Sequence, residues 1–177
     1  MATPGAALIE LVPRKELAPG GAATIRTQVI NAVLAQASIE LRMPIEKLVV
    51  RDLRPLADLD YTYETWRERT GSTVEAYETM STGTMLDQRY VAIYGVRDAS
   101  AGRGCVSLLK LNVGGGDRAI WNLENLDEEG IGYCPSAIVI PPNAPYTLSR
   151  WVVVAGQSAQ IILKGVVVEP RGKVVSP

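Results

Sequence analysis

The apolar residues of this chain fall into short runs that end at Pro, Gly or Ser, a pattern typical of strands joined by turns. The clearest case is Ser136–Pro170, where two long runs rich in Val, Ile and Trp are joined at Ala155–Ser158. Branched and aromatic side chains at this density favour strand over helix. We therefore predict that the chain closes with a hairpin of two long strands.

The return strand of this hairpin, Ile161–Val168, is apolar on both faces. One face carries Ile161, Leu163 and Val167, and the other carries Ile162, Val166 and Val168. A strand at the surface of a monomer instead alternates apolar with polar residues. The second face must therefore be covered by the domain's own first strands, by a swapped arm or by another subunit. On this argument Ile162, Val166 and Val168 are candidate interface residues.

Other apolar runs predict further strands with turns between them. The expected strands are Ala6–Val12, Lys47–Leu53, Leu59–Thr65, Gln88–Val96, Cys105–Val113 and Arg118–Leu126. Gly114–Asp117 predicts a tight hairpin turn, because glycine adopts positive φ without steric cost. Val74–Asp87 is weakly patterned, and its Ser81–Thr84 stretch predicts an exposed turn.

Residues 23–43 fit two patterns. Apolar residues recur every fourth position, as in an amphipathic helix, at Ile25, Val29, Val33, Ala37 and Leu41. Residues 35–43, however, alternate apolar with polar, and residues 23–29 nearly do so. No capping box precedes the segment and no glycine ends it. We therefore favour two strands, or one strand bent around residues 30–34, over a helix.

Together these runs give about eight or nine strands, with no strand–helix alternation and no internal repeat. The predicted fold is all-β: a single jelly-roll sandwich or barrel of about eight strands with an extended N-terminal arm. A chain of 177 residues is long enough to bury one such core. We expect an arm or edge strand over residues 1–22, the jelly-roll domain over residues 23–170 and a tail over residues 171–177.

The charge balance bears on the partners. The chain has 18 basic and 19 acidic residues, a formal net charge of −1, and no run of Lys or Arg. A dedicated nucleic-acid surface normally requires a basic excess, so we expect no specific nucleic-acid partner. The first residues lack the basic segment of a secretory signal, and no apolar run is long enough to predict a transmembrane helix.

Candidate chemistry is sparse. The chain has no histidine, which excludes His-assisted triads and removes the commonest metal ligand. The acidic groups at residues 127–129 and at Asp58 and Asp60 lack the spaced oxygen ligands of a calcium loop, so we expect solvated turns there. Cys105 and Cys134 form either one disulfide or two buried apolar positions. We predict no catalytic, cofactor-binding or metal-binding residues.

Three aromatic residues, Tyr61, Tyr63 and Trp66, lie within six positions of one another. Tyr61 and Tyr63 share a face with Leu59, which favours core packing. Trp66 has the opposite parity at the end of this strand, which makes it the fourth candidate interface residue. If they were exposed, the same residues together with Trp121 would suit a carbohydrate- or receptor-binding module.

In length, strand order and closing stretch, PPNAPYTLSRWVVVAGQSAQIILKGVVVEP, the chain resembles a viral single jelly-roll coat protein. More narrowly, over about residues 23–169, it is similar to the small major capsid proteins of tailless, membrane-containing icosahedral phages of Thermus. That family implies a barrel standing upright on the shell, a second and larger coat protein as partner, and contact with an internal membrane. It carries over no catalytic residues. The arm over residues 1–21 would suit clasping between subunits.

The predicted function is therefore that of a structural virion protein, a capsid subunit of the shell that self-associates into a dimer or a larger oligomer. A carbohydrate- or receptor-binding β-sandwich is the alternative. A cupin-type enzyme would need imidazole ligands that the chain lacks, although an enzyme built on a carboxylate pair stays open. We expect no enzymatic activity and no cofactor.

Overall fold

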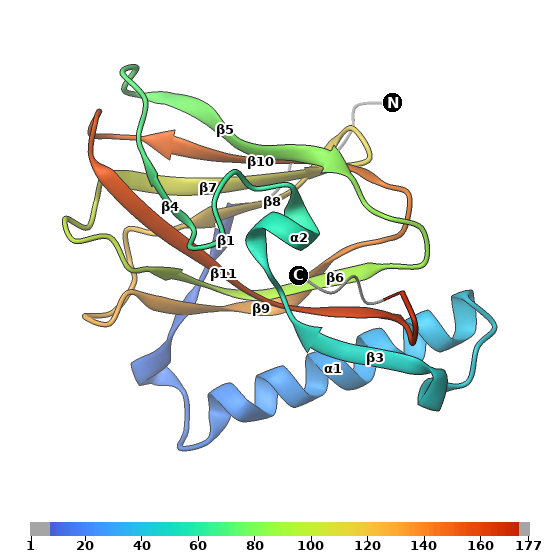
Figure 1. Ribbon diagram of the computed structural model, residues 1–177. Coiled ribbons are helices and arrows are strands. Elements are labelled where there is room, and N and C mark those ends of the chain that lie inside the picture. Colours follow the sequence, from blue (N-terminus) through green and yellow to red (C-terminus); the bar gives the residue numbers. More distant parts are fainter. Residues whose placement is uncertain (1–7, 174–177) are drawn as a thin grey trace, which may run out of the picture.

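The computed structural model describes residues 8–173, and these residues form a sandwich of two sheets with helix α1 (Gly21–Glu40) along one side (Figure 1). Sheet 1 has the order β1 (Leu8–Glu10), β8 (Gly116–Asn122), β7 (Val106–Val113), β10 (Pro145–Val152) and β5 (Ala76–Thr84). Sheet 2 has the order β2 (Val12–Pro13), β9 (Ile131–Ile140), β6 (Tyr90–Asp98), β11 (Ser158–Pro170) and β3 (Leu48–Asp52), and the short β4 (Arg67–Arg69) pairs with β11. Short helical turns cover Arg14–Glu16, Ile45–Lys47 and α2 (Pro55–Leu59). The predicted all-β class is confirmed.

The chain winds between the two sheets rather than completing one before the other. From β5 onward within the described residues, β7 and β8 are the only sequential strands that pair, and their turn places Gly114 and Gly115 at φ of 66° and 83°. These values favour glycine, so the turn predicted at Gly114–Asp117 is confirmed. Every other connection from β5 onward crosses from one sheet to the other.

The predicted closing hairpin is wrong, although both of its strands exist. β10 pairs with β5 and β7 in sheet 1, whereas β11 pairs with β6 and β3 in sheet 2. The link at Ala155–Ser158 is therefore a corner between the sheets. The physical reason is that each strand contributes one apolar face to the same core, so the two strands pack against each other across the sandwich instead of pairing edge to edge.

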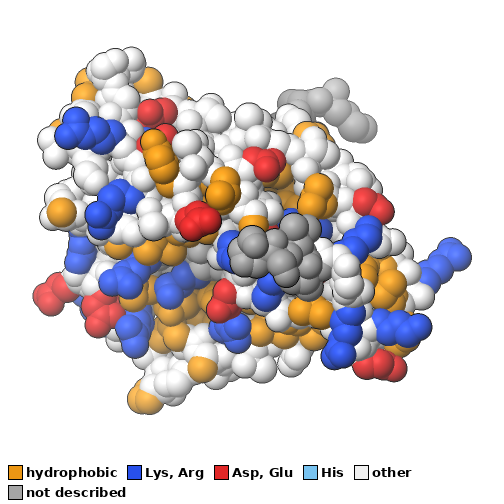
Figure 2. Space-filling view, in the orientation of Figure 1, with side chains coloured by type: hydrophobic (Ala, Val, Ile, Leu, Met, Phe, Trp, Pro, Cys, Tyr) orange, Lys and Arg blue, Asp and Glu red, His pale blue; other side chains and the backbone are white. Residues whose placement is uncertain are grey.

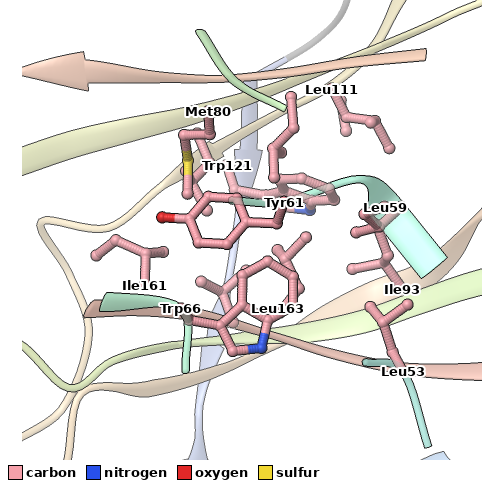
Figure 3. Packing of buried hydrophobic residues seen from close by; sticks show 14 of the residues in the cluster. Leu53, Leu59, Tyr61, Trp66, Met80, Ile93, Leu111, Trp121, Ile161 and Leu163 are labelled. Atoms are coloured by element: carbon pink, nitrogen blue, oxygen red, sulfur yellow. The ribbon is translucent and has the colours of Figure 1, made fainter. Parts of the chain in front are cut away.

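The main core fills the space between the sheets (Figure 3). Trp121 of β8, Leu109 of β7 and Ile93 of β6 are fully buried there, together with Tyr61 from the segment after α2. From β11, the cluster takes Ile161, Leu163 and Val167, the three residues predicted to share one face. This part of the strand pattern is confirmed.

Residues 21–40 form α1, so the preference for strands over residues 23–43 is wrong. The helix has no side-chain N-cap, and its C-terminal turn is closed without glycine: the N–H of Met43 donates to the carbonyl of Ser38, and Arg42 adopts a left-handed φ of 53°. This is the geometry of a Schellman motif with arginine in place of the usual glycine. Both expected end signals were therefore missing from the sequence, and packing against sheet 2 stabilises the helix instead.

Two further strand predictions are corrected. Leu59–Thr65 is not a strand, because Pro55 begins the short helix α2 and Asp60 ends it with a left-handed φ of 50°. Val74–Asp87 contains the long edge strand β5, and the turn expected at Ser81–Thr84 lies within that strand. The described strands number eleven, against the eight or nine predicted, because short pairings such as β1, β2 and β4 carry too few residues to form a pattern. Residues 1–7 of the predicted arm and residues 174–177 of the predicted tail lie outside the described residues.

Candidate interaction surfaces

The four predicted interface residues lie in or against the cores of this chain. Val166 and Val168 are fully buried beneath α1, in a second cluster with Val33 and Ala37 of that helix. Trp66 is 6% exposed in the main core, and Ile162 is partly buried against the same cluster. At Val166 and Val168, the layer that covers the second face of β11 is therefore the chain's own helix. The apolar second face of β11 therefore gives no argument for a neighbouring subunit at Val166 and Val168. The prediction failed there because residues 21–40 were expected to form strands and not a covering helix.

The aromatic residues of the alternative binding module are mostly inaccessible. Tyr61 and Trp121 are fully buried, and Tyr61 packs against Trp66 with their ring centroids 5.4 Å apart. Tyr63 points outward at 49% exposure, so the core packing predicted for it is wrong, whereas that predicted for Tyr61 is confirmed. Burial of Tyr61, Trp66 and Trp121 leaves Tyr63 as the one accessible ring of this group.

The outer face of sheet 1 carries a different aromatic pair that the sequence did not single out. Trp151 of β10 and Tyr77 of β5 are directly paired across the strands and meet edge to face, with ring centroids 5.0 Å apart. Lys110 of β7 places its Nζ 4.1 Å from the centroid of the Tyr77 ring. The same face continues through Leu108 and Ile120, which are partly exposed. The signal available in the sequence was the alternation along β10, which places Trp151 on the opposite face from Arg150 and Val152.

A groove lies between α1 and β9, with a volume of about 510 Å³. The helix contributes Ile25, Gln28, Val29 and Ala32 to one wall, and β9 contributes its segment 133–139 to the other. The register of β9 against β6 shifts between Tyr133 and Ile138, so the strand carries a bulge where it lines the groove. Together with Pro135, which has no N–H to donate, this bulge makes the edge of β9 a poor template for another strand.

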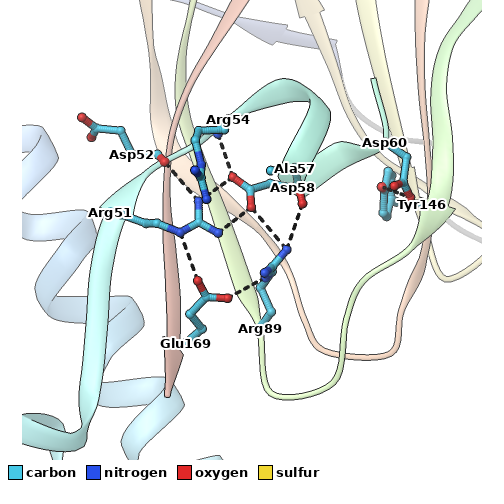
Figure 4. A network of polar contacts seen from close by, with 9 residues as sticks. All are labelled: Arg51, Asp52, Arg54, Ala57, Asp58, Asp60, Arg89, Tyr146 and Glu169. Carbon is cyan, nitrogen blue, oxygen red and sulfur yellow. Dashed lines mark hydrogen bonds and ion pairs between the residues drawn. The ribbon is translucent and has the colours of Figure 1, made fainter. Parts of the chain in front are cut away.

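A buried cluster of ion pairs joins β3, α2, β11 and the start of β6 (Figure 4). The guanidinium of Arg51 donates two hydrogen bonds of 2.6 Å to Asp58 and one of 3.0 Å to Glu169. Arg89 donates a 2.7 Å hydrogen bond to Glu169 and one of 3.3 Å to Asp58. The backbone N–H of Arg54 also donates to Asp58. The pairing with Asp58 raises the pKa of Arg51. Each buried charge is compensated, so this cluster is a structural clamp and not a vacant ligand site.

A second buried cation, Arg150, lies at the other end of the sandwich. Its Nε donates a 3.0 Å hydrogen bond to Glu78, and its Nη2 donates one of 2.8 Å to the carbonyl of Arg69. Glu68 lies 3.7 Å from Arg150 and accepts a hydrogen bond from the hydroxyl of Tyr61. Burial, and then the charge of Glu68, raise the pKa of Tyr61 and keep it protonated. Arg150 is thus fully paired, and these contacts hold β4 and β5 against β10.

The carboxylates that were weighed as metal ligands have other partners. Asp127 accepts hydrogen bonds from the backbone N–H groups of Lys15 and Ile131, and Glu129 pairs with Arg14 at 2.8 Å. Asp60 accepts a hydrogen bond from the hydroxyl of Tyr146. Over residues 8–173, no three Cys, Asp or Glu side chains converge as metal ligands.

Cys105 and Cys134 are both free and buried. Burial raises the pKa of Cys134 to about 12, so its sulfur remains a protonated thiol at neutral pH. A thiol in this state is neither a nucleophile nor a metal ligand. Of the two alternatives for these residues, the structure therefore has two buried apolar positions.

Basic and acidic side chains are interspersed with apolar ones on the face that carries α2 and β11 (Figure 2). No helix within residues 8–173 combines the length and apolarity needed to cross a membrane. No family model matches the chain, and no curated protein matches it significantly. The function must therefore be argued from the fold and its surfaces.

Proposed function

We propose that this chain is a structural virion protein, a capsid subunit that self-associates and assembles with other coat proteins into an icosahedral shell. The observation that carries the proposal is the strand order. The order β3-β11-β6-β9 packs against the order β5-β10-β7-β8, with one paired turn and crossing connections otherwise. Two four-stranded sheets wound in this way correspond to two interlocked Greek keys, the plan of jelly rolls in viral capsids, lectins and cupins.

The composition separates these three classes in part. Cupin metal sites are built from imidazoles, and this chain has no histidine. The resemblance of the closing stretch to small phage coat proteins favours the capsid subunit over the lectin. On this proposal the partners are further copies of the chain and a second, larger coat protein, with contact to an internal membrane, and the location is the virion.

The test is the state of association of the purified full-length chain. Light scattering from about 1 µM to 1 mM and negative-stain microscopy should show oligomers that grow into capsomers, sheets or shells, since coat subunits associate through extended complementary surfaces. A chain that stays monomeric at the highest concentration would refute the proposal.

A carbohydrate-binding sandwich is the second candidate, favoured by Trp151 and Tyr77 on the outer face of sheet 1. Sugars stack on exposed aromatic rings, and Lys110 lies beside this pair as a hydrogen-bond donor. A glycan array with the wild-type chain, Trp151→Ala and Tyr63→Ala tests it. Retention that is lost only in Trp151→Ala supports this candidate, whereas no retention by the wild-type chain eliminates it.

A further inference from the structure

The exposed face of α1 is unusual because it carries no charge between residues 23 and 39. Its exposed residues are Ala23, Thr24, Thr27, Gln28, Asn31, Ala32, Ala35 and Ile39. At the chain's 21% charged content, about two of these eight would be charged. Arg26, the one charged residue in this interval, lies on the flank and pairs with Asp52 at 2.8 Å. The helix therefore presents an uncharged surface where water-facing helices normally carry Lys and Glu.

Apolar groups flank this face on both sides. On one side, Ile30 and Leu34 are only partly buried. On the other side lies the groove of about 510 Å³ between α1 and β9, whose lip is formed by Gln28 and Ala32. At the C-terminal end of the helix, Ile39 is 76% exposed, the most exposed large hydrophobic residue of the described chain. Sheet 2 is thus covered by a helix that is itself incompletely covered.

We infer that this face of α1 is the self-association surface of the protein, and that its occupant is α1 of a second copy in antiparallel orientation. The inference rests on the proposed function only in that both require self-association. The two-fold axis would pass at Asn31, near the middle of the helix, where the amides of the two copies can bond to each other.

This arrangement is self-complementary by the geometry of the helix. At 100° per residue, residues equally far before and after Asn31 face each other across a two-fold axis. Thr27 then lies opposite Ala35 of the second copy, at the same level along the two helices. Each flank meets the same flank of the other copy. Ile30 and Leu34 pack against their own counterparts, and the lips formed by Gln28 and Ala32 meet each other.

The area and the chemistry favour a second copy over a lipid surface. A 20-residue helix is about 30 Å long and 10 Å wide, and with the groove two copies would bury on the order of 1,000 Å² in total, the lower range of specific interfaces. A membrane-surface helix would need Lys and Arg beside a bulky apolar face, whereas this face carries Thr, Gln, Asn and Ala.

The decisive experiment is a charge-pair rescue in the full-length chain, measured by sedimentation velocity from about 1 µM to 1 mM. Ala35→Glu should raise the dimer dissociation constant at least about 100-fold, because it buries an unpaired carboxylate at the interface. Adding Thr27→Lys should restore most of the affinity, because the lysine lies opposite the glutamate of the other copy. Within one helix the two residues are eight positions apart and do not meet. Ile120→Glu on the outer face of sheet 1 is the matched control and should leave the constant unchanged.

The inference would be overturned by a monomeric wild-type chain, by an unchanged dimer dissociation constant in Ala35→Glu, or by loss of the dimer in Ile120→Glu alone. Binding of the wild-type chain to phosphatidylcholine vesicles without dimer formation would also overturn it. Wild-type shells that persist in Ala35→Glu would refute this surface while leaving the capsid proposal intact. Dimers that never assemble further would support this surface and refute the capsid proposal.

Discussion

The two sheets of the sandwich differ in what lies on their outer faces. Sheet 2 is covered by α1, and its strands carry apolar side chains outward as well as inward, with Tyr90 and Val166 fully buried under the helix. Among residues 8–173, no helix covers the outer face of sheet 1, and Lys110, Trp151 and Ile120 remain partly exposed there. A strand that is apolar on both faces therefore indicates a covering layer, and that layer can be a helix of the same chain.

The largest expected effect comes from placing a charge on each face. Val166→Asp should destabilise the fold by about 4 kcal/mol or more, because the carboxylate is buried beneath α1 without a partner. Ile120→Asp on the open face should cost about 1 kcal/mol or less, since water reaches the new carboxylate. Urea unfolding of both variants checks this, and equal losses would contradict the distinction between a covered and an open face.

The second-largest loss of stability is expected from the buried ion cluster that links β3 to β11. Arg89→Met should cost about 4 kcal/mol, because Glu169 and Asp58 lose one of their two cationic partners while both remain buried. Arg26→Met removes the exposed pair with Asp52 and should cost less than about 1 kcal/mol. Thermal unfolding of the two variants provides the measurement, and an Arg89→Met protein as stable as Arg26→Met would show that the cluster is not a clamp.

The packing of α1 itself can be probed from its two sides. Val33→Ala should destabilise by about 2 kcal/mol, since Val33 is buried against sheet 2 and its loss leaves a cavity. Ile39→Ala on the exposed side should change the stability of the monomer by less than about 0.5 kcal/mol. Denaturation is best followed at a concentration below that of dimer formation. A larger loss in Ile39→Ala would mean that the exposed side is buried within the monomer.

The smallest effect is a pH dependence at the C-terminal end of α1. The hydroxyl of Tyr90 donates a 2.6 Å hydrogen bond to Glu40, and this bond, with a second one from Gln36, lowers the pKa of Glu40. The stabilisation is therefore present above the usual pKa of a glutamate and is lost as the pH falls through the lowered value. Because Glu40 is exposed, solvent screening limits this contribution to less than about 1 kcal/mol.

Tyr90→Phe isolates this contribution. The free energy of unfolding of the wild-type chain, measured at pH 7 and pH 3, should fall more than that of Tyr90→Phe over the same interval. Equal falls would show that the hydrogen bond to Glu40 contributes nothing to the attachment of the helix.

The two strands of the closing stretch show which features the residue pattern could predict and which it could not. The density of Val, Ile and Trp predicted β10 and β11 correctly, and the alternation along β11 assigned its two faces correctly for Val166 and Val167. Pairing could not be predicted, because a short Gly-containing link fits a hairpin and a corner between sheets equally well. The open-face pair of Tyr77 and Trp151 was missed for the same reason, since it depends on which strands are neighbours.

The β class, most of the strands and the glycine turn between β7 and β8 follow from local residue patterns, because each depends on residues close together in the chain. The helical state of residues 21–40 depends instead on contacts with distant parts of the chain. That segment alternates and also repeats every fourth residue, and neither of its ends carries a capping signal. The apolar outer face of sheet 2 selects the helix, because burying that face against Val33 and Ala37 stabilises the helical alternative alone.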